Sequence, residues 1–393
     1  MLADDSRGKP VQILRINDDH SFDISESQLE AILLDDRVKD KPVVVVSVAG
    51  AYRQGKSFRL SFFLRYLRNK CRTDWLDDTG VPLGGFEWRP GSKPHTTGIL
   101  LWEEAFLVTT PQGEEVAVLL MDTQGSFDCK STVKNCATIF ALSVMTSSVQ
   151  VYNVLRNIQE DQLQHLQLFA EYGKLAQKGA RNEPFQRLVF LVRDWEFPYE
   201  APYGASGGRM ILRDRLEIIG EEHEELQKLR QQMTKSFTKM DCFLMPRPGE
   251  KVEKDESYCG SLEDVSLEFK EKVQELVPWL LAPENLLVKK VNGEKITCRE
   301  LMNYFRKSHP QHKSRHHIHT TNSDITSKPQ NQISHPHHEI GHHIYFTKSN
   351  IIPTSQNRTS HTHHKIGFKL PGDFQQNITT RNPSKGFIIS SDI

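Results

Sequence analysis

A lysine and a serine stand directly after a glycine-bracketed turn, a combination that can bind the phosphates of a nucleotide. Residues 50–57 read Gly-Ala-Tyr-Arg-Gln-Gly-Lys-Ser, which matches the G-x-x-x-x-G-K-S loop. Gly50 and Gly55 allow backbone N–H groups to approach phosphate oxygens without an intervening side chain. Lys56 would place its ammonium against the β- and γ-phosphates, and the Ser57 hydroxyl would ligate Mg²⁺. The turn therefore predicts a site for a nucleoside triphosphate.

A second candidate cluster is Asp-Thr-Gln-Gly at 122–125, which follows the apolar run 116–121. The Asp122 carboxylate at a strand end would hold Mg²⁺, usually through water, and the Gly125 N–H would meet the γ-phosphate. Alone, D-x-x-G is too common to be informative. It supports the phosphate-binding turn here because it lies downstream of Lys56 and of a long loop that ends in Thr-Thr-Gly.

The third candidate is the pair Arg193-Asp194, which follows the apolar run 188–192. A carboxylate can accept hydrogen bonds from both N1–H and N2–H₂ of guanine, and adenine has no such pair of donors. An Arg-Asp pair stands where the Asn-Lys-x-Asp signature of GTPases is usual. The residues alone therefore leave two interpretations open: Asp194 reads guanine, or it is a strand-end carboxylate in a salt bridge.

Strands and helices must bring these residues to one edge of a sheet. The β-branched run Val43–Val48 predicts a strand buried on both faces of a parallel sheet. Residues 56–70 predict a helix with an aromatic face. Further strands are expected at 11–16, 98–109, 115–121, 148–154, 187–193 and 241–245, further helices at 25–34, 130–146, 159–178, 217–230 and, as the last one, 262–281, and a turn at 292–293. The fold class is therefore α/β, with a mostly parallel central sheet flanked by helices.

The composition excludes several classes of protein. The chain has 393 residues, with 50 Lys and Arg against 50 Asp and Glu, so no global charge favours nucleic acid or an anionic membrane. The six cysteines show no C-x-x-C spacing, which fits free thiols in a reducing compartment. The first residues are not those of a signal peptide, and no uncharged apolar run is long enough to cross a membrane.

Together, these motifs resemble the atlastins, dynamin-superfamily GTPases of the guanylate-binding-protein type that fuse tubules of the endoplasmic reticulum. The resemblance covers roughly residues 10–306. It rests on Val-Ala-Gly-Ala-Tyr-Arg-Gln-Gly-Lys-Ser, Thr-Thr-Gly-Ile-Leu, Leu-Leu-Met-Asp-Thr-Gln-Gly and Phe-Leu-Val-Arg-Asp-Trp-Glu-Phe-Pro-Tyr. It implies a P-loop GTPase fold, Mg²⁺-dependent hydrolysis of GTP to GDP and phosphate, a homodimer formed through the G domains, and a place at the cytosolic face of the endoplasmic reticulum.

The resemblance also implies roles that spacing does not. Arg53 matches the family's arginine finger, supplied in cis when two G domains meet, and Thr96 matches the switch threonine that closes over Mg²⁺. Arg193-Asp194 becomes the guanine-specifying pair. The expected catalytic residues are Arg53, Lys56, Ser57 and Thr96; the expected metal-binding residues are Ser57, Thr96 and Asp122; the expected nucleotide-binding residues are Gly50, Tyr52, Arg53, Gln54, Gly55, Lys56, Ser57, Phe58, Asp122, Gly125, Arg193 and Asp194.

The sequence departs from the family pattern in the switch loop and after residue 307. Pro90 and Pro94 restrict φ and remove N–H donors in a segment that must rearrange. The alternative function is therefore a poorly hydrolysing, GTP-dependent dimerisation module that titrates full-length atlastins. Family members continue into a helical bundle, a transmembrane hairpin and an amphipathic tail. Here a histidine-rich sequence follows instead, so we expect a chain without an anchor, soluble in the cytosol.

The expected domain organisation has four parts. A lead-in strand and helix occupy 1–39, the G domain 40–285, and a linker toward a missing helical bundle 286–307. A low-complexity tail at 308–393, which holds thirteen of the 17 histidines, is expected to be disordered. A metal site in the tail is the less favoured alternative, because no fixed spacing with Cys or Asp accompanies the histidines.

Overall fold

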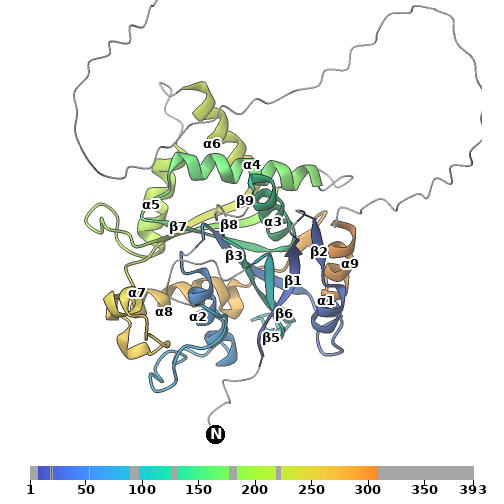
Figure 1. Ribbon diagram of the computed structural model, residues 1–393, viewed down its shortest axis with the longest axis horizontal. Coiled ribbons are helices and arrows are strands. Elements are labelled where there is room, and N and C mark those ends of the chain that lie inside the picture. Colours follow the sequence, from blue (N-terminus) through green and yellow to red (C-terminus); the bar gives the residue numbers. More distant parts are fainter. Residues whose placement is uncertain are drawn as a thin grey trace, which may run out of the picture. The chain divides into compact units, whose positions relative to one another are not determined.

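In the computed structural model, a central sheet carries helices on both of its faces (Figure 1). The structure describes residues 8–308 except 18, 20, 53, 89–96, 126–131, 177–183 and 218–222. The predicted tail therefore lies outside the described residues. The strands are β1 (Pro10–Ile16), β2 (Phe22–Ile24), β3 (Val43–Gly50), β4 (Ile99–Trp102), β5 (Phe106–Thr109), β6 (Glu115–Thr123), β7 (Val149–Leu155), β8 (Phe185–Arg193), β9 (Phe237–Leu244), β10 (Lys290–Val291) and β11 (Glu294–Lys295). The α-helices are α1 (Glu26–Leu33), α2 (Lys56–Arg68), α3 (Val133–Thr146), α4 (Glu160–Ala176), α5 (Ala205–Leu216), α6 (Glu224–Ser236), α7 (Glu250–Lys254), α8 (Leu267–Leu281) and α9 (Cys298–Ser308).

The strand order places the nucleotide motifs at neighbouring strand ends. Within the described ranges the main sheet runs β2-β1-β4-β6-β3-β7-β8-β9, and β5 also pairs with β6. The neighbours from β6 through β9 are parallel, whereas β1, β2, β4 and β5 pair antiparallel. The predicted α/β fold with a mostly parallel central sheet is confirmed. Parallel strands end at the same edge, so the turns after β3, β6 and β8 lie together there.

The strand β3 is buried along its whole length because its valines pack on both faces of the sheet. Val44 and Val46 belong to the core that α2 and α8 cover. Val43 and Val45 point to the other face, into the core beneath α1, α3 and α9. A strand covered on both faces is typical of the middle of a parallel sheet, and this position fixes the start of the phosphate-binding turn.

The structure corrects four expectations about elements. The segment expected as a helix at 217–230 is helical, among the described residues, only from Glu224, where α6 begins. The strand expected at 98–109 is two strands, β4 and β5, because they pair with opposite halves of β6. The last strand of the main sheet, β9, begins four residues earlier than expected, at Phe237. The segment 262–281 begins as a 3₁₀ turn, and it is followed by a further helix, α9.

The start of α9 has a local cause. Thr297 Oγ1 accepts a hydrogen bond from Glu300 N (3.3 Å), and Thr297 N donates one to Glu300 Oε2 (2.8 Å). This reciprocal pair is a capping box. The expected turn at 292–293 is confirmed, because Val291 pairs with Glu294 across it. The apolar face of α9 is buried, and the four domain bounds stay predictions.

The amino end of β3 is bonded to the segment that precedes α9. Lys289 N donates to Val43 O (2.7 Å), and Val43 N donates to Ile296 O (3.0 Å). These bonds extend the strand's hydrogen bonding at the edge opposite the phosphate-binding turn. No helix in the described ranges is long and apolar enough to cross a membrane.

Candidate nucleotide site

The candidate phosphate-binding turn connects β3 to α2. Gly50 is the last residue of β3 and pairs with Asn153 of β7. Gly55 is the N-cap residue of α2 and has a φ of 68°, a left-handed conformation that favours glycine. The first turn of α2 leaves backbone N–H groups without helical partners, and such groups attract anions.

Lys56 is the first residue of α2 and reaches back over the turn. Its Nζ donates to Ala51 O at 3.2 Å, and the residue is only 6% exposed. Burial lowers the pKa of Lys56, while the Asp122 carboxylate opposes that shift. A buried ammonium attracts the negative charge of a phosphate chain, and the carboxylate nearby favours the charged form of the lysine.

Ser57 and Asp122 meet between α2 and the end of β6. The Ser57 hydroxyl donates to Asp122 Oδ2 at 2.6 Å, and Asp122 is fully buried. A hydroxyl and a carboxylate oxygen are hard oxygen donors of the kind that Mg²⁺ prefers, so these residues fit the predicted metal ion. Thr96, the third expected ligand, lies outside the described residues.

Gly125 lies directly against the phosphate-binding turn. A Cβ added to Gly125 would stand 2.1 Å from Tyr52 Cα and 2.5 Å from Tyr52 N. The two backbones can approach so closely only because Gly125 has no side chain. The structure therefore joins the D-x-x-G segment and the turn, as the order of motifs predicts. Arg53, the next residue of the turn after Tyr52, lies outside the described residues.

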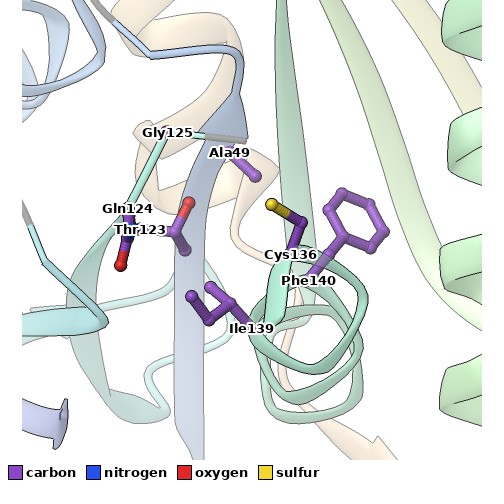
Figure 2. Close-up of a pocket in the computed structure, with 7 residues that line it drawn as sticks. All are labelled: Ala49, Thr123, Gln124, Gly125, Cys136, Ile139 and Phe140. Atoms are coloured by element: carbon purple, nitrogen blue, oxygen red, sulfur yellow. The ribbon is translucent and has the colours of Figure 1, made fainter. Parts of the chain in front are cut away.

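A small, mostly apolar pocket adjoins Gly125 on the side of α3 (Figure 2). Residues of α3 face the ends of β3 and β6 across it, and Figure 2 shows the Cys136 sulfur and the Phe140 ring on the helix side. Its lining consists of Ala49, Thr123, Gln124, Gly125, Cys136, Ile139 and Phe140. Lys56, Ser57 and Asp122 are not part of this lining, so the pocket meets the candidate nucleotide site at Gly125 and not at the polar side chains.

Arg193 and Asp194 form a salt bridge at the end of β8. Arg193 Nε and Nη2 both contact Asp194 Oδ2, at 3.0 and 2.5 Å. Asp194 is 5% exposed, and its Oδ1 is buried without a hydrogen-bond partner among the described residues. The salt bridge is therefore present, and the reading of guanine by Asp194 stays a prediction, because the second carboxylate oxygen has no hydrogen-bond partner among the described residues.

Further polar atoms at this edge are buried without a hydrogen-bond partner in the described part of the chain. They are Gln54 Oε1, Arg59 Nε and Asn153 Oδ1. Such an atom costs roughly 1–3 kcal/mol when it is left unsatisfied. Together with Asp194 Oδ1 they lie around the phosphate-binding turn and the ends of β7 and β8.

The side chain of Phe58 does not join this polar set. It is buried and makes edge-to-face contacts with Phe62 and Trp88, each at a ring-centroid distance of 5.2 Å. Its contribution to nucleotide binding would therefore come from its backbone. Tyr52 is 40% exposed.

Sequence reasoning missed Arg59 and Asn153. Arg59 Nη1 donates to the carbonyls of Gln54 and Gly55, and Asn153 Nδ2 donates to Gln54 O at 2.7 Å. A charged residue inside an otherwise apolar helix face was a signal for Arg59. Asn153 had only the signal of a polar residue at a strand end.

Comparison with known proteins shows the family of this chain. Residues 19–291 match the profile of the guanylate-binding protein, N-terminal domain. The chain is 54% identical to Atlastin-1 of Bos taurus over 297 residues, which are 76% of this chain and 53% of that protein. It is 54% identical to Atlastin-2 of Homo sapiens over 298 residues, which are 76% of this chain and 51% of that protein. It is 53% identical to Atlastin of Drosophila melanogaster over 302 residues, which are 76% of this chain and 56% of that protein. The chain spans about half the length of the curated relatives it matches.

Proposed function

The chain belongs to the atlastin family and carries its guanylate-binding-protein-type G domain, and on that premise we propose that it is a GTPase. It binds GTP with Mg²⁺ and hydrolyses it to GDP and phosphate. The observation that carries the proposal is the 2.6 Å hydrogen bond from Ser57 to Asp122. It lies beside the turn in which Lys56 Nζ donates to the carbonyl of Ala51. A hydroxyl, a carboxylate and an ammonium at a helix start match what a magnesium-bound triphosphate needs.

The phosphate chain would lie over the turn and the start of α2. Backbone N–H groups from Gly55 onward and the Lys56 ammonium bind its oxygens. Ser57 and Asp122 would hold the metal ion, together with Thr96. Magnesium, when bound, neutralises charge on the β- and γ-phosphates. Gly125, which contacts the turn, supplies an N–H for the γ-phosphate.

The guanine base would be recognised by Asp194. Its Oδ1 has no hydrogen-bond partner among the described residues, while Arg193 donates to Oδ2. A carboxylate in this state accepts from the N1–H and N2–H₂ of guanine. Adenine presents an acceptor at N1 and would leave the carboxylate unsatisfied, which is the costlier outcome.

The family resemblance supports the finer parts of the proposal. Arg53 would act as the arginine finger in cis when two G domains dimerise on GTP. A family function in tethering and fusing membranes of the endoplasmic reticulum would place the chain at the cytosolic face of that membrane. A variant of the proposal is a module that dimerises on GTP and hydrolyses it poorly because of Pro90 and Pro94.

Phosphate release from GTP and from ATP, measured with Mg²⁺ at several protein concentrations, tests the proposal. We expect turnover of GTP but not ATP, with a specific rate that rises with protein concentration. Binding of GTP without turnover would contradict the enzymatic claim. Size-exclusion chromatography with a non-hydrolysable GTP analogue then distinguishes the variant, because dimers without turnover favour the poorly hydrolysing module.

A further inference from the structure

Arg59 is a buried cation directly behind the phosphate-binding turn. It lies on α2, one helical turn after Gly55, and is only 4% exposed. Its Nη1 donates to Gln54 O at 3.2 Å and to Gly55 O at 3.1 Å. Both acceptors are main-chain carbonyls of the turn itself. The guanidinium is therefore hydrogen-bonded to the backbone segment that would bind the phosphates.

The planarity of the peptide bond gives this contact a consequence for the ligand. In a trans peptide, the carbonyl of one residue and the N–H of the next point in opposite directions. When Arg59 holds the carbonyls of Gln54 and Gly55, the N–H groups of Gly55 and Lys56 must point away from Arg59. These are the groups that would cradle the α- and β-phosphates.

A second side chain holds one of the same carbonyls. Asn153, at the end of β7, donates from Nδ2 to Gln54 O at 2.7 Å. Gln54 O thus accepts hydrogen bonds from a helix on one side and from a strand on the other. A peptide held by two donors has little freedom to rotate, so its N–H direction is set before any ligand arrives.

We propose that Arg59 is a positioning residue whose side chain orients the N–H group of Gly55 toward the nucleotide phosphates. It also reinforces the orientation of the Lys56 N–H, because Gly55 O already accepts the helical hydrogen bond of Arg59 N at 3.2 Å. The proposal deepens the proposed function and rests on it. Arg59 touches neither the phosphates nor the base in this account; it acts through the two carbonyls that it holds.

The charges around Arg59 support this role. Burial lowers the pKa of Arg59 to about 9; Arg193 lowers it as well, and the Asp194 carboxylate raises it. At neutral pH the guanidinium is therefore still charged. A charged donor makes hydrogen bonds to carbonyls that are roughly twice as strong as those of a neutral donor. The hydrogen bonds from Arg59 to the turn are therefore strong at neutral pH.

The same helix provides a matched control. Arg65 is also buried, and it also donates to main-chain carbonyls: Nε to Trp75 O at 3.2 Å and Nη1 to Val81 O at 2.9 Å. Those carbonyls lie in the loop after α2 and not in the turn. A variant at Arg65 therefore removes a buried, carbonyl-binding arginine from α2 without touching the phosphate-binding turn.

The experiment measures the affinity of the full chain for fluorescent GTP and GDP, alongside thermal unfolding. The variants are Arg59→Leu, Arg59→Lys and Arg65→Leu. We expect Arg59→Leu to weaken both nucleotides by the same factor, roughly tenfold or more, since a charged hydrogen bond is lost. Arg59→Lys keeps the positive charge and can still donate to one of the two carbonyls. Its affinity for both nucleotides should therefore fall by a smaller, several-fold factor. Arg65→Leu should lower thermal stability and leave both affinities near those of the wild type.

The outcomes separate the inference from the function on which it rests. A wild-type chain that binds neither nucleotide refutes the proposed function. A wild-type chain that binds, with an Arg59→Leu variant of equal affinity, refutes only the role of Arg59. An equal loss in Arg59→Leu and Arg65→Leu also refutes it, because the loss then follows helix stability. Should Arg59→Leu not fold, Arg59→Lys decides, and wild-type affinity in that variant overturns the proposal.

Discussion

The Ser57 hydroxyl and the Asp122 carboxylate lie 2.6 Å apart, although one belongs to the first turn of α2 and the other to the end of β6. The register of the sheet explains this proximity. Val48 of β3 is paired with Asp122 of β6, so the turn that follows β3 passes over the end of β6. Two motifs far apart in the chain thus converge on one position because their strands are parallel neighbours.

Lys56→Ala should abolish tight nucleotide binding. The variant loses a buried cation that would contact two phosphates, and a charged hydrogen bond is worth about 1.5–3 kcal/mol, or roughly tenfold to hundredfold in affinity. Titration with fluorescent GTP measures the effect. Lys41→Ala serves as the control, because Lys41 forms an exposed ion pair with Glu115. Undiminished binding by Lys56→Ala would refute the assignment of the turn.

Asp194→Asn should change which base is bound. The amide can accept from N1–H but cannot accept from N2–H₂, so affinity for GTP should fall by roughly tenfold or more. Its NH₂ can donate to the 2-oxo group of xanthine, so XTP should gain affinity. Competition between GTP, ATP and XTP measures the preference, with Asp214→Asn on the exposed surface of α5 as the control. An unchanged GTP:XTP ratio would show that Asp194 only forms the salt bridge.

Gly125→Ala should separate the D-x-x-G segment from the turn. The new methyl group would overlap the backbone of Tyr52, and backbone cannot move aside as a flexible side chain can. Overpacking of this kind costs about 1–3 kcal/mol, so both the melting temperature and GTP affinity should fall. Gly80→Ala is the control, because a Cβ there would make only an ordinary contact with Asp78 at 3.4 Å. Equal behaviour of the two variants would contradict the close approach.

Lys289→Met should remove a pH dependence of folding. Lys289 is 4% exposed, and burial lowers its pKa from 10.5 to about 7. Between pH 7 and 10 the unfolded chain binds the proton and the folded chain does not, so this residue makes stability rise with pH, by at most about 1.4 kcal/mol per unit. Below pH 7 both states are protonated, and its destabilising effect is complete.

The measurement for Lys289→Met is the free energy of unfolding between pH 6 and 10. We expect a flatter profile than that of the wild type and a higher stability at pH 7. Lys290→Met, at the exposed neighbouring position, should leave the profile as it is. A wild-type profile that falls from pH 7 to 10 and is unaffected by Lys289→Met would rule out a neutral buried amine.

The site residues predictable from sequence were those whose role depends on the local chain. The turn from Gly50 to Ser57 carries its own signal, because its chemistry needs adjacent residues in a strand-turn-helix context. Asn153 could not be assigned, since its contact with Gln54 joins residues far apart in the chain that only the assembled sheet brings together. Arg59 contacts Gln54 locally, and the sequence signalled only that its charge is unusual on an apolar helix face. The Asp194 oxygen without a hydrogen-bond partner among the described residues likewise depends on how the Arg193 side chain bonds to the other oxygen.

The errors in the fold have different causes. The break between β4 and β5 depends on pairing with β6, which the apolar pattern of 98–109 does not encode. The start of α9 was readable, because Thr-Cys-Arg-Glu at 297–300 is a capping box. The long β9 reflects its parallel pairing with the whole of β8, since a neighbouring strand extends a ladder beyond the residues that look apolar.

Hydrogen bonds between Val43 and the segment 289–296 attach the amino end of β3 at the edge of the sheet opposite the phosphate-binding turn. Eight residues of extended chain span roughly 26 Å. Side chains pack closely on both faces of this strand and leave no free volume into which it could move. The turn that begins at Gly50 is thus held at a fixed distance from the segment that leads into α9.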